Sequence, residues 1–266
     1  MELEKICQEV IAIAKTAGSF IAHERINFDL KLVELKGKAN FVSYVDKNAE
    51  KIIVESLRKL LPESGFITEE GTAFASGEKY RWVIDPLDGT TNFIHGSPPY
   101  AVSIGLMEYE EIILGVVYEI TRDECFYAWK GSKAMLNGKE IRVSEASTTE
   151  EALISTGFPY GEIKHTDEFI ETIKYFMANS HGIRRLGSAA TDLSYVAAGR
   201  FEAFWEIGLS PWDVAAGALI LQQAGGRVSD FRGNNNFLFS GEIVASNNNY
   251  FNEFQSIVEN NYCRKE

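Results

Sequence analysis

Residues 82–92 read Trp82-Val83-Ile84-Asp85-Pro86-Leu87-Asp88-Gly89-Thr90-Thr91-Asn92, an apolar run that changes abruptly into an acidic turn. The apolar residues predict a buried strand, so we expect the carboxylate of Asp85 to emerge at its C-terminal edge. Pro86 fixes the backbone where the chain turns, and Asp88 is expected to point back toward the same space. Gly89 and Thr90 then begin a helical turn whose free N–H groups can form a concave anion site.

Two carboxylates three residues apart across a tight turn can share one divalent cation or bridge two. Mg²⁺ prefers hard oxygen ligands and keeps several of its waters, so two carboxylates and a backbone carbonyl suffice to bind it. The alternative is a solvated turn in which the acids only cap the backbone, and a bare Asp-x-x-Asp pattern leaves that alternative open.

Two other predicted elements also end in acids. A short apolar strand stops at Glu69 and Glu70, a pair that alone would be typical of a solvated loop. Ser210, Pro211 and Asp213 suit the N-cap, N1 and N3 positions of a predicted helix. The favourable interaction of an acid at N3 with the helix dipole is enough to explain Asp213 without a role in metal binding. Taken singly, each acidic end therefore has an ordinary structural explanation.

Hydrophobic periodicity divides the chain into two halves. Residues 1–143 predict two helices, an antiparallel sheet of short strands and an Asn137-Gly138 hairpin. From residue 144 onward strands alternate with helices, which are expected at 166–179, 188–198, 211–224 and 249–260. We therefore expect a layered α/β fold with alternating α and β layers. Its two packed halves, 1–143 and 144–266, would enclose the active site between them.

The composition disfavours several classes of protein. A net charge of −12 argues against direct binding of nucleic acid, whose phosphates must be neutralised by clustered Lys and Arg. Cys7, Cys125 and Cys263 have no CxxC spacing, which suits reduced thiols in a cytoplasmic protein and not a disulfide framework or a zinc site. The most apolar stretches are too short to cross a membrane. An acidic protein that handles phosphates is expected to do so through metal ions.

Together the three acidic segments resemble those of the inositol monophosphatases, Mg²⁺-dependent and lithium-sensitive phosphatases. Asp85-Pro86-Leu87-Asp88-Gly89-Thr90 is similar to the family motif D-P-[IL]-D-G-T-T, and Trp212-Asp213-Val214-Ala215-Ala216-Gly217 to the motif W-D-x-A-[AG]-G. Glu69-Glu70 lies where the family has G-E-E, with Thr68 in place of the usual Gly. The resemblance covers most of the chain and implies the layered fold of that family.

The resemblance also implies a set of metal ligands and catalytic residues. Two or three Mg²⁺ ions would be held by Glu69, Asp85, the Leu87 carbonyl, Asp88 and Asp213, with Asp85 between the principal pair. Thr90 would polarise the attacking water and Asp46 would be its partner. These two residues, together with the metal ligands Glu69 and Asp85, form the expected catalytic group. The alternative is that Asp46 caps a predicted helix and has no catalytic role, because it follows Ser43 at the start of that helix.

Substrate contacts are implied mainly in the second half of the chain. Phosphate would rest on the N–H groups of Gly89 and Thr90, and the polyol would contact Gly187, Ser188, Ala189 and Glu206. The alternative for Glu206 is a salt bridge to Arg184, Arg185 or Arg200. Either Lys36 or Lys38 could steer phosphate, and Arg184 and Arg185 could be a solvated strand edge or a second phosphate site. His95 receives no role.

These features predict hydrolysis of the phosphate monoester of a small metabolite, foremost myo-inositol monophosphate. A homodimer is what the resemblance suggests. The alternative substrates are fructose 1,6-bisphosphate, the 2′-phosphate of NADP and a nucleotide bisphosphate, or the protein could have a dual specificity. Family members with these activities share the same metal ligands, so the motifs do not separate them. A different hypothesis is a protein that binds a macromolecule, for instance RNA polymerase machinery, with vestigial catalysis. The intact set of acids disfavours that last hypothesis.

Overall fold

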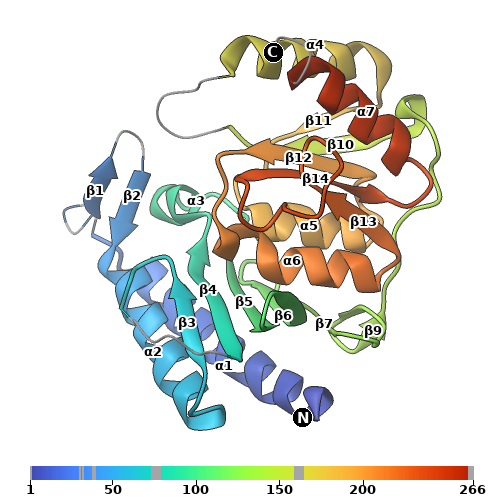
Figure 1. Ribbon diagram of the computed structural model, residues 1–266. Helices are drawn as coiled ribbons and strands as arrows, with labels where there is room; N and C mark the ends of the chain where they lie inside the picture. Colours follow the sequence, from blue (N-terminus) through green and yellow to red (C-terminus); the bar gives the residue numbers. More distant parts are fainter. Residues whose placement is uncertain are drawn as a thin grey trace.

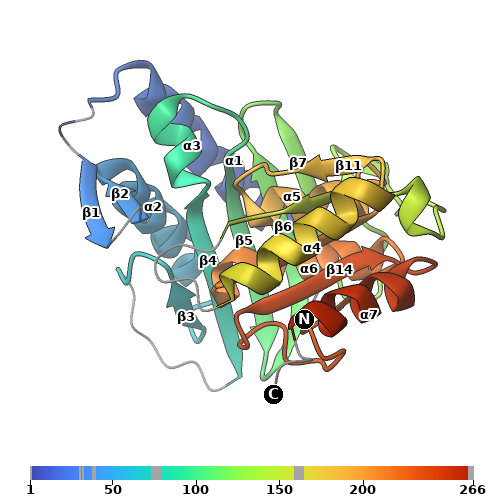
Figure 2. The same ribbon diagram turned by 90° about the horizontal axis from the view of Figure 1, so that it is seen from above.

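The computed structural model shows five layers in which helices and sheets alternate (Figures 1 and 2). It describes residues 2–29, 31, 33–37, 40–72, 79–158 and 165–262. The three helical layers each contain two helices, namely α1 (Leu3–Ile26) and α2 (Tyr44–Leu60), α5 (Ala189–Ala197) and α6 (Pro211–Gln223), and α4 (Thr166–Asn179) and α7 (Phe251–Tyr262). The expected α/β layering is confirmed.

The first sheet has seven strands and is mixed, so the expectation of an antiparallel sheet is wrong at one edge. Its strands, in spatial order, are β3 (Gly65–Thr68), β4 (Tyr80–Asp88), β5 (Ala101–Glu108), β6 (Glu111–Glu119), β7 (Glu124–Trp129), β8 (Met135–Leu136) and β9 (Lys139–Glu140). Strands β3 and β4 run parallel, with Thr68 opposite Ile84. The carboxyl ends of parallel strands coincide, and this pairing brings Glu69 beside Asp85.

The second sheet has five strands, in the spatial order β11 (Gly182–Arg184), β10 (Leu153–Thr156), β12 (Ala203–Ile207), β14 (Glu242–Asn247) and β13 (Gly226–Ser229). Strand β10 is parallel to both of its neighbours, and β14 is antiparallel to both of its own. A separate hairpin, β1 (Val33–Gly37) with β2 (Asn40–Ser43), has no counterpart in the sequence prediction. Val33, Glu34, Leu35 and Lys36 alternate apolar with polar residues, so the sequence pattern of β1 was present but was missed.

Local sequence patterns are confirmed where they specify backbone conformation. Ser43 and Asp46 form a capping box at the start of α2. Asn137 and Gly138 both have positive φ, 48° and 80°, as a type I′ turn between β8 and β9 requires. Cys7 and Cys125 are free, buried thiols, whereas Cys263 lies outside the described residues.

The middle helical layer joins the two sheets into one packed structure. Helix α6 is apolar on nearly all sides, as expected for a helix covered on both faces. No helix in the described part of the chain has the length and apolarity needed to span a membrane. The chain passes from the first sheet to the second between β9 and β10, close to residue 144. However, α6 follows that point in the sequence and still packs against strands of the first sheet, so the two halves are not separate in space. The division at residue 144 therefore stays a prediction.

Two glycines on the first sheet allow α6 to approach it closely. A Cβ on Gly115 would lie 2.5 Å from the carbonyl oxygen of Ala216, and one on Gly105 would lie 3.2 Å from the Cβ of Ala215. The obstacle at Gly115 is helix backbone, which cannot rotate away. Because Asp213 occupies the first turn of the same helix, this close packing also sets the position of its carboxylate.

We predict that Gly115→Ala lowers the free energy of unfolding by about 1–3 kcal/mol, since the added methyl overpacks the sheet–helix contact. Gly105→Ala should cost less, because its nearest neighbour is a side-chain methyl. Urea denaturation of both variants, with unchanged m-values, measures the two costs. Equal stability of Gly115→Ala and the parent would show that the contact is loose.

Candidate active site

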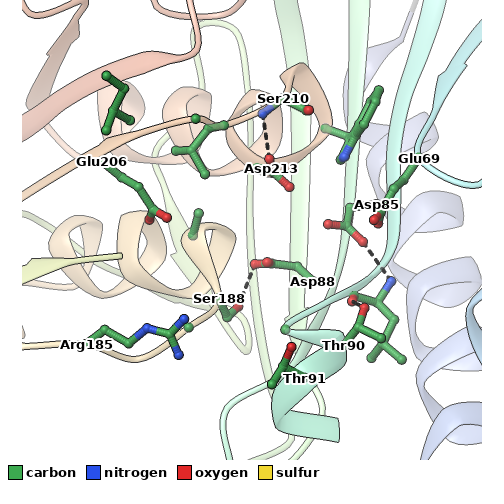
Figure 3. Close-up of a pocket in the computed structure, with 18 residues that line it drawn as sticks. Glu69, Asp85, Asp88, Thr90, Thr91, Arg185, Ser188, Glu206, Ser210 and Asp213 are labelled. Atoms are coloured by element: carbon green, nitrogen blue, oxygen red, sulfur yellow. Dashed lines mark hydrogen bonds between the residues drawn. The ribbon is translucent and has the colours of Figure 1, made fainter. Parts of the chain in front are cut away.

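A cleft of about 300 Å³ opens where the carboxyl end of β4 meets α5 and α6 (Figure 3). Its volume is at the lower end of the range for small-molecule sites. Both halves of the chain line it, and the predicted site residues among its walls are Glu69, Asp85, Leu87, Asp88, Gly89, Thr90, Gly187, Ser188, Ala189, Glu206 and Asp213. Asp46 lies behind this wall, where it contacts Thr90.

Three aspartates converge at the centre of the cleft. Asp85, Asp88 and Asp213 each offer one carboxylate oxygen, and these oxygens all lie within 4.8 Å of one another. In a regular strand, residues three apart point to opposite faces. The pairing of β4 with β5 shifts register between Asp85 and Asp88, and this irregularity turns both side chains toward Asp213.

Backbone N–H groups two or three residues away in the chain orient Asp85 and Asp213. Asp85 Oδ1 accepts a hydrogen bond from the Leu87 N–H at 2.9 Å, and Asp213 Oδ2 accepts one from the Ser210 N–H at 2.7 Å. Asp213 thus caps α6 and also faces the other two acids (Figure 3). The capping explanation that the sequence allowed does not exclude a role as a metal ligand.

The charges of these acids oppose one another in a site with little solvent. Burial raises the pKa of Asp85 well above its ordinary value, and the charges of Glu69, Asp88 and Asp213 add to the shift. Burial raises the pKa of Asp88 to about 6, although hydrogen bonds from Ser188 and Ala190 oppose that shift. The pKa of Asp213 is likewise raised well above its usual range, by burial and then by Asp88.

A divalent cation is what this donor set fits. The donors are hard carboxylate oxygens, they are fixed by the backbone, and their mutual repulsion disappears when a cation binds between them. Glu69, which lines the same cleft, adds a further carboxylate. An Asp cluster able to hold a metal ion is therefore present.

Thr90 and Asp46 form a hydrogen-bonded pair at one edge of the cleft. The Thr90 hydroxyl lies 2.9 Å from Asp46 Oδ1 and 3.0 Å from the Leu87 carbonyl oxygen, and it can donate to either. The other carboxylate oxygen, Asp46 Oδ2, accepts the Ser43 N–H at 2.8 Å. Asp46 thus caps α2 with one oxygen and contacts Thr90 with the other, so the two predicted roles are compatible.

Ser188 is the N-cap residue of α5, and its hydroxyl is directed at an acid of the cluster. It donates to Asp88 Oδ2 at 2.6 Å, and the Ala190 N–H donates to the same oxygen at 2.8 Å. Gly89 has a φ of 91°, and a Cβ there would lie 3.2 Å from the Gly187 carbonyl oxygen. The predicted substrate-contacting segment of α5 therefore also orients Asp88, a contact that the sequence did not indicate.

Glu206 is the next-to-last residue of β12 and faces the cleft from the side opposite Thr90 (Figure 3). Its carboxylate occupies the space that a side chain at Gly157 would need. Burial raises its pKa well above the ordinary value, the charges of Asp192, Asp213 and Asp88 add to this, and Arg185 opposes it. Its environment therefore disfavours the charge unless hydrogen-bond donors approach it.

Among the arginines considered as partners of Glu206, two are engaged elsewhere. Arg200 forms an ion pair with Glu124 at 2.6 Å, and Arg184 is exposed and bonds the Ile183 carbonyl of its own strand. Arg185 lines the cleft, with its guanidinium carbon 5.4 Å from the centre of the Phe158 ring.

Several residues near the cleft were missed by sequence reasoning. Thr91, Trp212 and the loop 207–210 also line it, and Asp192 is a buried acid near Glu206. The position of Asp192 one helical turn after Ser188 could have indicated it. His95 is exposed at the end of α3 (Thr90–His95). Lys38 and the side chain of Lys36 lie outside the described residues.

Comparison with known proteins places this geometry in a family. The model of the inositol monophosphatase family matches residues 2–261. A Nus factor SuhB from Pseudomonas aeruginosa is 44% identical over 92% of this chain and 93% of its own. An inositol-1-monophosphatase from Mesorhizobium japonicum is 41% identical over 90% of each chain. The crystal structure of extragenic suppressor protein suhB from Bartonella henselae superposes with a TM-score of 0.90, at 39% identity over 96% and 98% of the two chains. The chain therefore belongs to the inositol monophosphatase family.

Proposed function

We propose that this protein is a Mg²⁺-dependent phosphatase whose principal substrate is myo-inositol monophosphate. The observation that carries the proposal is the convergence of Asp85, Asp88 and Asp213 within 4.8 Å in a cleft that Glu206 also lines. The relative named inositol-1-monophosphatase, at 41% identity, supports the choice of substrate. The proposal includes a cytoplasmic homodimer that Li⁺ inhibits.

The proposed ligands of two or three Mg²⁺ ions are Glu69, Asp85, the Leu87 carbonyl, Asp88 and Asp213. When bound there, Mg²⁺ would lower the pKa of a coordinated water and stabilise the negative charge on the phosphate and the leaving oxygen. The backbone bonds to Asp85 and Asp213 and the Ser188 hydroxyl bond to Asp88 hold the carboxylates in place before any ion arrives.

Thr90 and Asp46 would orient the attacking water. When the Thr90 hydroxyl donates to Asp46, the lone pairs on its oxygen are free to accept a proton from water, and the negative Asp46 carboxylate strengthens that acceptor. The water oxygen would bond to phosphorus in line as the bond between phosphorus and the ester oxygen breaks on the opposite side, and the departing alcohol oxygen would take up a proton from solvent. No phosphoenzyme is needed, and the hydroxyl of Ser188, in the wall of the cleft, is already bonded to Asp88.

The proposed substrate contacts lie on both sides of the acid cluster. The N–H groups of Gly89 and Thr90 would bind the phosphate oxygens. Across the cleft, Glu206 would accept hydrogen bonds from ring hydroxyls, with Gly187 and Ala189 forming the adjoining wall. Hydroxyl donors would also lessen the cost of a charged Glu206 in its buried position.

The runner-up is the same chemistry on another substrate: fructose 1,6-bisphosphate, the 2′-phosphate of NADP, or a nucleotide bisphosphate. Arg185 supports this alternative, because its positive charge in the wall of the cleft could bind a second phosphate group of such a substrate. A second class of function is suggested by the relative named a Nus factor, at 44% identity. In that case the protein would act by binding a macromolecule, and catalysis would be secondary.

The experiment that separates these functions is phosphate release from a panel of inositol monophosphates, fructose 1,6-bisphosphate, NADP and adenosine 3′,5′-bisphosphate. With Mg²⁺ we expect turnover, highest for inositol monophosphate, and in excess EDTA none. Full activity in EDTA would refute the metal mechanism. No turnover of any substrate, together with macromolecule binding that survives Asp85→Asn, would establish the second class.

The Thr90–Asp46 pair predicts a specific kinetic signature. Thr90→Ala should lower kcat by roughly a hundred- to ten-thousandfold with little change in KM, because the hydroxyl acts on the nucleophile. Asp46→Asn should behave similarly, and the double variant should lose less than the two single losses combined. Steady-state kinetics of the three variants measures this coupling, and fully independent losses would indicate that Asp46 acts only as a helix cap.

Glu206 predicts selectivity for hydroxyl-bearing substrates. A charged acceptor facing ligand hydroxyls contributes about 1.5–3 kcal/mol, so Glu206→Gln should reduce kcat/KM for inositol monophosphate about ten- to a hundredfold. Hydrolysis of p-nitrophenyl phosphate, which offers no hydroxyls, is the control and should barely change. Equal losses on both substrates would mean that Glu206 supports the structure of the site and does not bind the polyol.

A further inference from the structure

Glu50 is a fully buried carboxylate on α2 that belongs to none of the motifs described above. Its oxygen Oε2 accepts a hydrogen bond from the Glu70 N–H at 2.8 Å. The other oxygen, Oε1, accepts two bonds from Thr72, from the N–H at 2.8 Å and from the hydroxyl at 2.7 Å. One side chain thus holds three donors of the segment 70–72.

This segment directly follows Glu69, one of the proposed metal ligands. On its other side, Glu69 is tied to β4, because its N–H donates to the Ile84 carbonyl at 3.3 Å, one residue before Asp85. Gly71, with a φ of 66°, turns the chain between the two residues that Glu50 binds. The backbone of Glu69 is therefore fixed between β4 and Glu50.

Asp46 and Glu50 are four residues apart, so they project from the same face of α2. Asp46 contacts the Thr90 hydroxyl, and Glu50 holds the segment after Glu69. One helix, rigidly packed against the first sheet, thereby sets the positions of two separate parts of the cleft.

We infer that Glu50 is a positioning residue for metal binding, which fixes Glu69 as a ligand by anchoring the segment 69–72. The inference rests on the proposed Mg²⁺ site. A ligand gains affinity when its backbone is held in place before the ion binds, and residues that orient ligands typically change metal affinity ten- to a hundredfold when replaced. Without Glu50, the N–H of Glu70 would lose its acceptor and the segment could move with Glu69.

The chain contains a matched control for a purely structural role. Glu119, at the end of β6, is also fully buried. One of its oxygens accepts the N–H and the hydroxyl of Thr121, and the other accepts the Arg122 N–H at 2.9 Å. The bonding pattern is the same as at Glu50, but residues 121–122, which Glu119 holds, are not next to a residue of the cleft, whereas the segment that Glu50 holds directly follows Glu69.

The test compares Glu50→Gln with Glu119→Gln. In either variant the amide carbonyl can keep the two threonine bonds, while the amide NH₂ then faces a backbone N–H, donor against donor. Calorimetric titration with Mg²⁺ alone, well below the unfolding temperature, should show affinity lowered about ten- to a hundredfold in Glu50→Gln and unchanged in Glu119→Gln. Amide hydrogen exchange should rise at residues 69–72 only in Glu50→Gln.

Equal Mg²⁺ affinity in Glu50→Gln and the parent would overturn the inference and leave the proposed function intact. Equal losses in both variants would also overturn it, since general destabilisation would then be the cause. A parent that binds no Mg²⁺ would refute the proposed function itself. If Glu50→Gln does not fold, Thr72→Val removes only the exposed threonine's hydroxyl bond. It should weaken Mg²⁺ binding in the same direction by less, and unchanged affinity would refute the inference.

Discussion

Mutual repulsion among buried and half-buried carboxylates is the constraint on which this structure depends. Asp85, Asp88 and Asp213 bring oxygens within 4.8 Å of one another, and burial raises the pKa of each. Such an arrangement costs free energy without a cation, so strong packing elsewhere must hold it. The core on both faces of the first sheet supplies that packing.

Three different structural devices bring the acids together. The parallel pairing of β3 with β4 places Glu69 beside Asp85, the irregularity in β4 turns Asp85 and Asp88 to one side, and the close approach of α6 to Gly115 delivers Asp213. Each device departs from the simplest local geometry, which would be a hairpin, a regular strand or an ordinary helix–sheet spacing. All three devices contribute acids to the same cleft, which explains why these unusual local geometries occur together.

The sequence predicts best what local physical chemistry determines. The capping box at Ser43, the type I′ turn at Asn137 and the start of α6 at Pro211 all follow from single residues with strong backbone preferences. The predicted metal ligands also lie together, because the long motifs around Asp85 and Asp213 resemble those of one family. The alternation of strands and helices then sufficed to predict the layers.

What the sequence could not indicate depends on contacts between distant segments. An apolar run such as β3 or β4 predicts a strand but not whether it runs parallel or antiparallel to its neighbour. The Ser188 hydroxyl contacts an acid a hundred residues away, and Glu50 contacts a turn about twenty residues away. No local preference distinguishes these side chains from solvated ones, and only the fold reveals their partners.

The most direct measurement of the central claim is the free energy of unfolding against pH, in EDTA and in Mg²⁺. A carboxyl whose pKa is raised by folding stabilises the folded state below its unfolded pKa and loses that contribution as pH rises through its folded pKa. In EDTA, the crowded acids should therefore destabilise the protein from about pH 4 upward, through the Asp88 pKa of about 6. Mg²⁺ should offset this loss, so the stability difference between the two conditions should widen with pH. Curves that coincide at every pH would contradict a cation site among these carboxylates.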